Sequence, residues 1–182
     1  MKKRVVITGL GAITPIGKTA NETWNGIKNK ECGVDEIKLF NAENFKTKFD
    51  AEVKDFNPLD YLDMKQAKRL DKSSQFAIIA GREALKDSGI TTENTDFNNV
   101  GVFVSSGIGG LTTIQQQCEI NYEKGNNRVS PMFIPMGIAN MPAGNVAIDL
   151  GLKGESISIV TACASSTHAI GEAFRNIQDG YE

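Results

Sequence analysis

Three short runs rich in β-branched residues constrain the fold of this chain most strongly. They are residues 4–7 (RVVI), 100–104 (VGVFV) and 156–160 (SISIV). We interpret each run as a strand that is buried on both faces of a sheet. Each is followed within a few residues by Gly, Ser or Ala and then by a helical stretch. This repeat of strand, small-residue turn and helix predicts a layered α/β fold.

Five segments have the spacing or the end signals of helices: 20–30, 73–88, 112–124, 136–150 and 164–178. The second is the clearest, because apolar residues recur at helical spacing from Phe76 to Leu85 and Gly89 stands where a C-terminal cap belongs. Pro142 is expected to break or bend the fourth helix. Residues 34–59 have no clear period, and we expect an excursion with little regular structure there.

Charge and composition argue against several classes of protein. Among 182 residues, 20 Lys and Arg stand against 22 Asp and Glu, a formal charge of −2 that does not require a broad nucleic-acid-binding face and leaves a local basic patch open. No apolar run approaches the roughly 20 residues of a membrane span, and residues 1–4 lead into a predicted strand rather than a signal peptide. Three cysteines without a CxxC pair predict free thiols in the cytoplasm. With only one histidine, the chain has few ligands for a His/Cys zinc site. We predict neither cofactor nor metal.

A glycine-rich turn follows the first predicted strand at residues 9–14 (GLGAIT). In dinucleotide-binding folds such a turn holds the pyrophosphate at a helix N-terminus. Here Thr14 occupies the position of the third glycine, and Pro15 and Gly17 delay the helix. The sequence therefore favours a structural tight turn over a nucleotide site.

The segment with the clearest chemistry is residues 161–166 (TACASS), where the third predicted strand meets the last predicted helix. Cys163 lies where that helix is expected to begin, and a helix N-terminus favours the thiolate. The unpaired backbone N–H groups there, including that of Cys163, can hold an oxyanion, and small neighbours let a substrate approach. On position alone, a reactive nucleophile and a buried structural cysteine are equal alternatives.

His168 is the obvious partner to consider for Cys163. It follows five residues later, which on a helix is about 140° around the axis. The two side chains should therefore point apart, and we expect a packing or supporting role for His168 rather than a direct Cys–His pair. Cys32 and Cys118 have no supporting motif, and we interpret both as structural.

A basic cluster, Lys65, Lys68 and Arg69, has the spacing of one helix face. One interpretation is a solvated surface balanced by neighbouring acids. The acids in question are Asp60, Asp63 and Asp71. The other interpretation is a docking surface for an acidic partner.

Five segments in order carry a family resemblance: 5–17 (VVITGLGAITPIG), 68–77 (KRLDKSSQFA), 102–110 (VFVSSGIGG), 130–144 (SPMFIPMGIANMPAG) and 159–171 (IVTACASSTHAIG). Together they resemble the elongating β-ketoacyl-acyl carrier protein synthases of type II fatty acid synthesis, and the synthases II most closely. The resemblance implies the thiolase fold, in which two similar α/β halves pack into five layers. Residues 1–182 would form the N-terminal part, with the C-terminal half absent.

The resemblance also implies a reaction. Cys163 would accept an acyl chain from acyl carrier protein as a thioester. Malonyl-acyl carrier protein would then lose carbon dioxide, and its enolate would attack the thioester to lengthen the chain by two carbons. Two histidines and a lysine that assist this step in the family lie in the second half, and His168 matches none of them. We therefore expect the chain on its own to be inactive.

Further roles follow from the resemblance alone. Ile108 would line and gate the acyl pocket, Ala162 would border the nucleophile, and Phe133 would reach the pocket from the partner subunit of a cytoplasmic homodimer. The basic cluster would dock the acidic carrier protein, which favours the docking interpretation. Neither nucleic acid nor membrane is expected as a partner.

Two alternatives remain open. A ketosynthase of a polyketide pathway would have a similar nucleophile turn. A noncatalytic companion subunit, which binds a partner and shapes the chain-length pocket, is less favoured because Cys163 is present.

Overall fold

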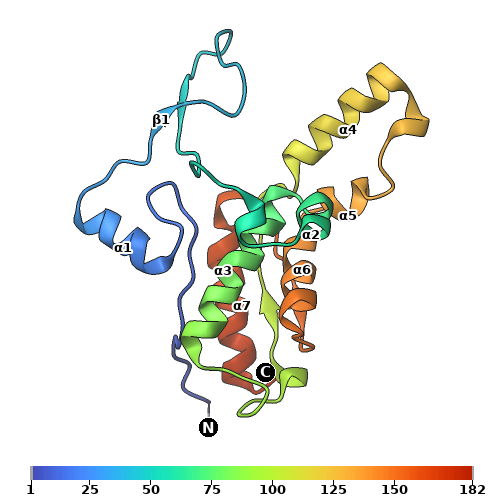
Figure 1. Cartoon of the computed structure of the whole chain (residues 1–182). Helices are drawn as coiled ribbons and strands as arrows, with labels where there is room; N and C mark the ends of the chain where they lie inside the picture. Colours follow the sequence, from blue (N-terminus) through green and yellow to red (C-terminus); the bar gives the residue numbers. More distant parts are fainter. Residues whose placement is uncertain (1, 182) are drawn as a thin grey trace.

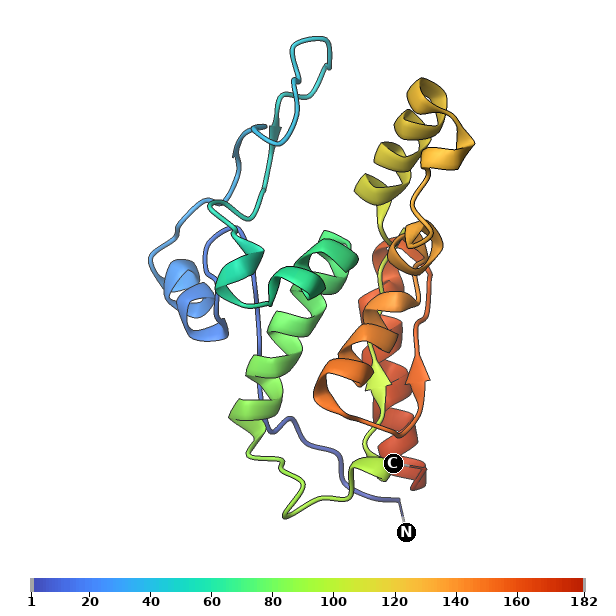
Figure 2. The ribbon, with the colours of Figure 1, turned by 45° about the vertical axis from the view of Figure 1, so that its right-hand side comes forward.

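Two short parallel strands lie at the centre of the computed structural model, which describes residues 2–181. They are β3 (Val102–Phe103) and β4 (Ser156–Ile157), with Val102 opposite Ser156. Helix α6 (Met141–Leu150) packs on one face of the pair and α7 (Ser165–Asp179) on the other (Figure 2). This layering confirms the α/β class. The strands are shorter than predicted, and only Val102 of the four residues is buried.

Helix α3 (Lys72–Ser88) packs along α6 and completes the outer layer (Figure 1). The Asp71 side chain caps its first turn, and Gly89 ends it in the left-handed conformation at φ 68°. The predicted helix 73–88 is thereby confirmed. One buried cluster joins the layers, and each buried Leu, Ile or Val side chain in it contributes about 1.5–3 kcal/mol. Its members are Leu62, Ile78, Val102, Ala143 and Val146.

The remaining helices follow the sequence. Helices α1 (Ala20–Lys28), α4 (Leu111–Lys124) and α7 lie where they are predicted. The apolar segment 136–150 is broken near Pro142, as expected, and belongs to two helices, α5 (Phe133–Gly137) and α6. The break precedes Pro142, because a proline in the first turn of α6 loses no helical hydrogen bond. Within residues 2–181, no helix combines the length and apolar character of a membrane span.

Short elements complete the chain. Helix α2 (Met64–Arg69) has only six residues. Single turns of 3₁₀ helix are found at η1 (Pro58–Asp60), η2 (Phe97–Asn99), η3 (Asn126–Arg128) and η4 (Ala162–Ala164). These turns lie in the segments that connect the longer helices and strands.

The predicted strand at residues 4–7 is wrong for this structure. The segment is extended, but no neighbouring strand pairs with it among the described residues, and Val6 and Ile7 are 60% and 83% exposed. A β-branched run forms a strand only where another strand meets its backbone. This segment instead crosses from the C-terminal end of α7, where Lys3 donates its N–H to the Gln178 carbonyl at 3.2 Å, to the C-terminal end of α3, which the chain meets at Gly9 (Figure 2).

The glycines of the GLGAIT segment bring the chain against α3. A Cβ atom on Gly9 would lie 2.3 Å from the carbonyl oxygen of Ala84, and one on Gly11 would lie 1.9 Å from that of Ala80. Both distances are far inside van der Waals contact. Glycine is therefore required here by close packing against a helix backbone.

Two carboxylates of α3 hold the same segment. Glu83 accepts a hydrogen bond from the backbone N–H of Ala12, and Asp87 accepts one from that of Leu10, both at 2.9 Å. The N–H groups that would bind a pyrophosphate in a nucleotide fold are thus taken by negative side chains. The geometry supports the structural interpretation of this turn.

Residues 34–56 form an arm that projects from the layers (Figures 1 and 2). Its regular structure is one antiparallel pair, β1 (Asp35–Glu36) and β2 (Phe49–Asp50). The expectation of little regular structure in this region is confirmed.

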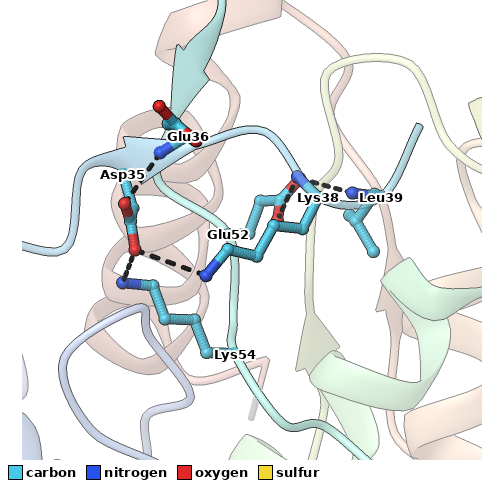
Figure 3. A network of polar contacts seen from close by, with 6 residues as sticks. All are labelled: Asp35, Glu36, Lys38, Leu39, Glu52 and Lys54. Atoms are coloured by element: carbon cyan, nitrogen blue, oxygen red, sulfur yellow. Dashed lines mark hydrogen bonds and ion pairs between the residues drawn. The ribbon is translucent and has the colours of Figure 1, made fainter. Parts of the chain in front are cut away.

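Charged contacts tie the base of the arm together (Figure 3). Asp35 pairs with Lys54 at 2.8 Å and with Lys38 at 3.7 Å, while Glu52 accepts backbone N–H groups of Lys38 and Leu39. The hydrogen bond from Lys54 lowers the pKa of Asp35 to about 2.

Candidate active site

Cys163 lies in the turn that joins β4 to α7. It is the middle residue of η4, its side chain is exposed, and α7 begins two residues later at Ser165. The alternative of a buried structural cysteine is therefore wrong. The sequence placed Cys163 at the start of a helix, and it lies in the 3₁₀ turn that leads into that helix.

The backbone of this turn is strained at Ala162. Its φ is +52°, a left-handed conformation that costs a residue with a Cβ atom about 1–2 kcal/mol. Within residues 2–181, only Lys30 and Asp55 are other non-glycine residues with positive φ. Such strain persists only where surrounding contacts hold it, and it is frequent at functional sites.

Ser165 supplies these contacts. Its side chain accepts a hydrogen bond from the backbone N–H of Thr161 at 2.9 Å and donates one to the carbonyl of Ala162 at 2.7 Å. Only 3% of its surface is exposed. The sequence reasoning missed Ser165, although a hydroxyl residue in the first turn of a helix is a known signal for local backbone bonding.

The backbone N–H of Cys163 has no acceptor among the described residues, whereas that of Ala164 donates to Thr161. An unpaired N–H beside an exposed sulfur can stabilise negative charge on a carbonyl oxygen bound there. The turn therefore offers both a nucleophile and one hydrogen-bond donor.

His168 contacts Thr161 rather than Cys163. Its Nδ1 lies 2.8 Å from the Thr161 hydroxyl. This agrees with the expectation that no direct Cys–His pair forms.

Within residues 2–181, no three His, Cys, Asp or Glu side chains gather as metal ligands.

The loop after β3 meets the Cys163 turn. A Cβ atom on Gly107 would lie 3.6 Å from the carbonyl oxygen of Ala162, and the Ser105 hydroxyl accepts the N–H of Ile159 at 3.0 Å. Ile108 follows Gly107 and is 62% exposed. The structure thus brings Ile108 to the same edge as Ala162 and Cys163, at the carboxyl ends of the parallel strands.

A third segment, residues 137–140, backs this junction. Gly110 donates its N–H to the carbonyl of Gly137 at 2.9 Å, and the Ser158 hydroxyl donates to that of Ala139 at 3.1 Å. Phe133 lies one turn earlier, on α5, where it lines a separate cavity of about 390 Å³ beside α4. The Phe133 ring also lies next to Gly137, where an added Cβ atom would be 3.8 Å from its Cε2 atom.

The basic cluster lies on α2, and all three side chains are exposed. The neighbouring acids are engaged elsewhere. Asp63 caps α2, Asp71 caps α3 and accepts the Thr113 hydroxyl at 2.6 Å, and Asp60 accepts from Asn57. Among the described residues, Lys65, Lys68 and Arg69 form no ion pair, so their charges face solvent.

An ion pair beneath α2 fixes its position. Asp149 of α6, 6% exposed, accepts Arg82 Nε at 2.7 Å and Nη2 at 2.6 Å, and also Gln66 Nε2 of α2 at 3.2 Å. The hydrogen bond from Arg82 to Asp149 raises the pKa of the guanidinium. Gln66 thus joins α2 to α6, and the Ala67 carbonyl, which accepts Gln75 Nε2 at 3.0 Å, joins α2 to α3.

Comparison with curated proteins identifies close relatives. The chain is 46% identical over 180 residues to 3-oxoacyl-[acyl-carrier-protein] synthase 2 of Synechocystis sp. and 43% identical over 178 residues to the protein of that name from Staphylococcus aureus strain N315. These alignments cover 99% and 98% of this chain but 43% of each relative. The chain thus spans less than half the length of these relatives.

Solved structures show the same fold. A β-ketoacyl synthase from Burkholderia phymatum matches with a TM-score of 0.84 at 27% identity, over 100% of this chain and 45% of the other. The ishigamide ketosynthase/chain length factor matches with 0.86 at 25% identity, over 99% and 45%. A complex of a type II PKS acyl-carrier protein with its ketosynthase matches with 0.83 at 24%, over 99% and 48%, which speaks to the fold alone.

The family model for the β-ketoacyl synthase N-terminal domain matches residues 2–182, nearly the whole chain. The resemblance in the five sequence segments and the layered fold agree with this match. The chain therefore belongs to the β-ketoacyl synthase family, as its N-terminal domain.

Proposed function

We propose that this chain forms the nucleophile-bearing part of a 3-oxoacyl-[acyl-carrier-protein] synthase, with Cys163 as the acyl acceptor. One observation carries the proposal: an exposed sulfur lies in a strained strand-to-helix turn, beside a backbone N–H without a partner. The names of the relatives at 46% and 43% identity support the substrate class. We place the enzyme in the cytoplasm, where thiols stay reduced.

Acyl transfer to Cys163 would proceed in two bond changes. The Cys163 thiolate attacks the carbonyl carbon of the acyl thioester, and the C=O electron pair moves onto oxygen. The tetrahedral species then collapses and expels the carrier thiolate, which takes the proton lost by Cys163. One backbone donor to the oxyanion is worth about 2.7–4 kcal/mol of barrier.

Condensation would need more than these residues. Malonyl-carrier protein loses carbon dioxide, its enolate carbon attacks the Cys163 thioester, and the thiolate of Cys163 leaves. The one histidine, His168, is bonded to Thr161. We propose that groups outside residues 1–182 stabilise the enolate, so that this chain alone does not condense.

The acyl chain would leave Cys163 past Ala162 and Ile108. The contact between the Gly107 loop and Ala162 supports this path. Phe133 faces another cavity of its own chain, and its contribution to the pocket would come across a homodimer from the partner subunit.

Intact mass spectrometry tests the acyl acceptor. The chain is incubated with acyl-loaded carrier protein, and wild type is expected to gain one acyl mass. Cys163→Ala should gain none, because the nucleophile is gone. Cys118→Ala is the matched control, since Cys118 is also exposed, and it should still gain the mass. An adduct that persists in Cys163→Ala would remove Cys163 from this role.

Carrier docking on α2 is tested by charge reversal. Lys65→Glu with Lys68→Glu should weaken binding by about 2 kcal/mol, roughly 30-fold, if each reversed rim charge costs about 1 kcal/mol. The loss should shrink as salt rises, because exposed charges are screened. Lys46→Glu with Lys48→Glu, on the exposed arm, is the control. Equal affinity for all three proteins would restore the solvated-surface interpretation.

A further inference from the structure

We infer that Ser165 is a positioning residue for acyl transfer, which orients the peptide between Ala162 and Cys163 so that its N–H faces the incoming carbonyl. The inference rests on the proposed function of Cys163 as acyl acceptor. It adds a residue that touches neither substrate nor sulfur and acts through the backbone.

The contacts of Ser165 converge on one carbonyl group. Both its hydroxyl, at 2.7 Å, and its backbone N–H donate to the carbonyl oxygen of Ala162. The same hydroxyl accepts the N–H of Thr161 at 2.9 Å. Because Ser165 is 3% exposed, water does not readily replace these bonds.

Peptide geometry transmits this constraint to Cys163. The carbonyl of Ala162 and the N–H of Cys163 belong to one planar trans peptide, so they point in opposite directions. When Ser165 holds the carbonyl on the α7 side, the N–H must face away from α7. No described residue accepts that N–H.

The hydroxyl also holds an unfavourable backbone. Ala162 has a φ of +52°, which a residue with a Cβ atom adopts only under constraint. Without the Ser165 hydroxyl, the Thr161 N–H loses its acceptor. The Ala162 carbonyl then keeps only the backbone N–H of Ser165 as a donor. Ala162 should then relax toward negative φ, and the Cys163 N–H should turn from the carbonyl site.

Two reactions of Cys163 separate this role from a general loss of structure. An acyl thioester forms a tetrahedral oxyanion before its thiol leaves, and the N–H of Cys163 stabilises it. Iodoacetamide alkylates the sulfur by direct displacement of iodide, and no carbonyl oxyanion forms at the reacting carbon. The ratio of the two rates therefore reports the orientation of the N–H.

The variants are Ser165→Ala, Ser165→Thr, which keeps the hydroxyl, and Ser166→Ala as the matched control. Ser166 is exposed and makes no side-chain hydrogen bond within residues 2–181. Rates at Cys163 are measured on the 182-residue chain by peptide mapping with acyl-CoA and with iodoacetamide. We expect Ser165→Ala to lower the acylation-to-alkylation ratio at least about tenfold, with both other variants near wild type.

An unchanged ratio in Ser165→Ala, or an equally low ratio in Ser165→Thr, would overturn the inference. NMR coupling constants give the φ of Ala162 as a second readout, expected positive in wild type and negative in Ser165→Ala. If wild type takes no acyl group, the proposed function fails, and the φ measurement alone then decides. A positive φ in Ser165→Ala would refute the positioning role in either case.

Discussion

Replacing Arg82 should lower the free energy of unfolding more than replacing its ion-pair partner Asp149. The Asp149 side chain is 6% exposed, whereas that of Arg82 is 39% exposed. Arg82→Met strands a buried carboxylate that keeps only Gln66 as a donor. Asp149→Ala leaves a guanidinium that still donates to the Tyr61 carbonyl and reaches water.

The magnitudes follow from these exposures. Breaking a buried pair costs about 3–5 kcal/mol, and the methionine keeps the packing of the arginine stem, so Arg82→Met should cost about 3 kcal/mol. Asp149→Ala should cost about 1–2 kcal/mol, because solvent screens Arg82 and alanine is a better helix former by about 0.5 kcal/mol. The double variant should be more stable than Arg82→Met alone, since it contains no stranded charge.

Urea unfolding followed by circular dichroism measures these free energies. In thermal melts, a chain of this length should lose roughly 2–4 °C per kcal/mol. The reasoning is refuted if Asp149→Ala destabilises as much as Arg82→Met, or if the double variant shows the sum of the two single losses.

Two further predictions concern the base of the arm and the N-terminal segment. The folded pKa of Asp35, about 2, lies below its usual 3.8, so its ionised form stabilises the fold above pH 3.8, and this contribution disappears as pH falls through about 2. NMR titration should show a midpoint near 2, which Lys54→Met returns toward 3.8; an unmoved midpoint would rule out this cause. Gly11→Ala should destabilise by at least about 2 kcal/mol, because its methyl would lie 1.9 Å from Ala80, while Gly171→Ala, in open space on α7, should stabilise by about 0.5–1 kcal/mol. Equal urea midpoints for these two variants would contradict the close packing.

Helices were the most predictable part of the fold, because their signals are local. The stripe from Phe76 to Leu85 and the cap at Gly89 specify α3 from its own residues. Strands were less predictable, because a ladder needs a partner. Residues 4–7 have strand composition, yet they lie extended between the C-terminal ends of α7 and α3, with Val6 and Ile7 exposed. Nothing in the run itself distinguishes these outcomes.

The sequence predicted the reactive residue of the site but not the contacts that hold its backbone. Small residues around Cys163 indicated an accessible sulfur, and the structure exposes it. The left-handed Ala162 and the two bonds of the Ser165 hydroxyl depend on the path of the turn in three dimensions. The sequence also did not show that the basic side chains of α2 lack ion pairs. The nearby aspartates suggested such pairs, but in the structure Asp63 and Asp71 cap helices instead.

A competition on the unmutated chain tests the acyl-acceptor claim most directly. Samples alkylated to increasing extents with iodoacetamide are exposed to acyl-carrier protein, and peptide mapping then quantifies alkylation at Cys32, Cys118 and Cys163. All three thiols are exposed, so accessibility alone does not single one out. Acyl uptake should fall in direct proportion to alkylation of Cys163 and show no relation to the other two. Acyl groups found on chains already alkylated at Cys163 would contradict the account.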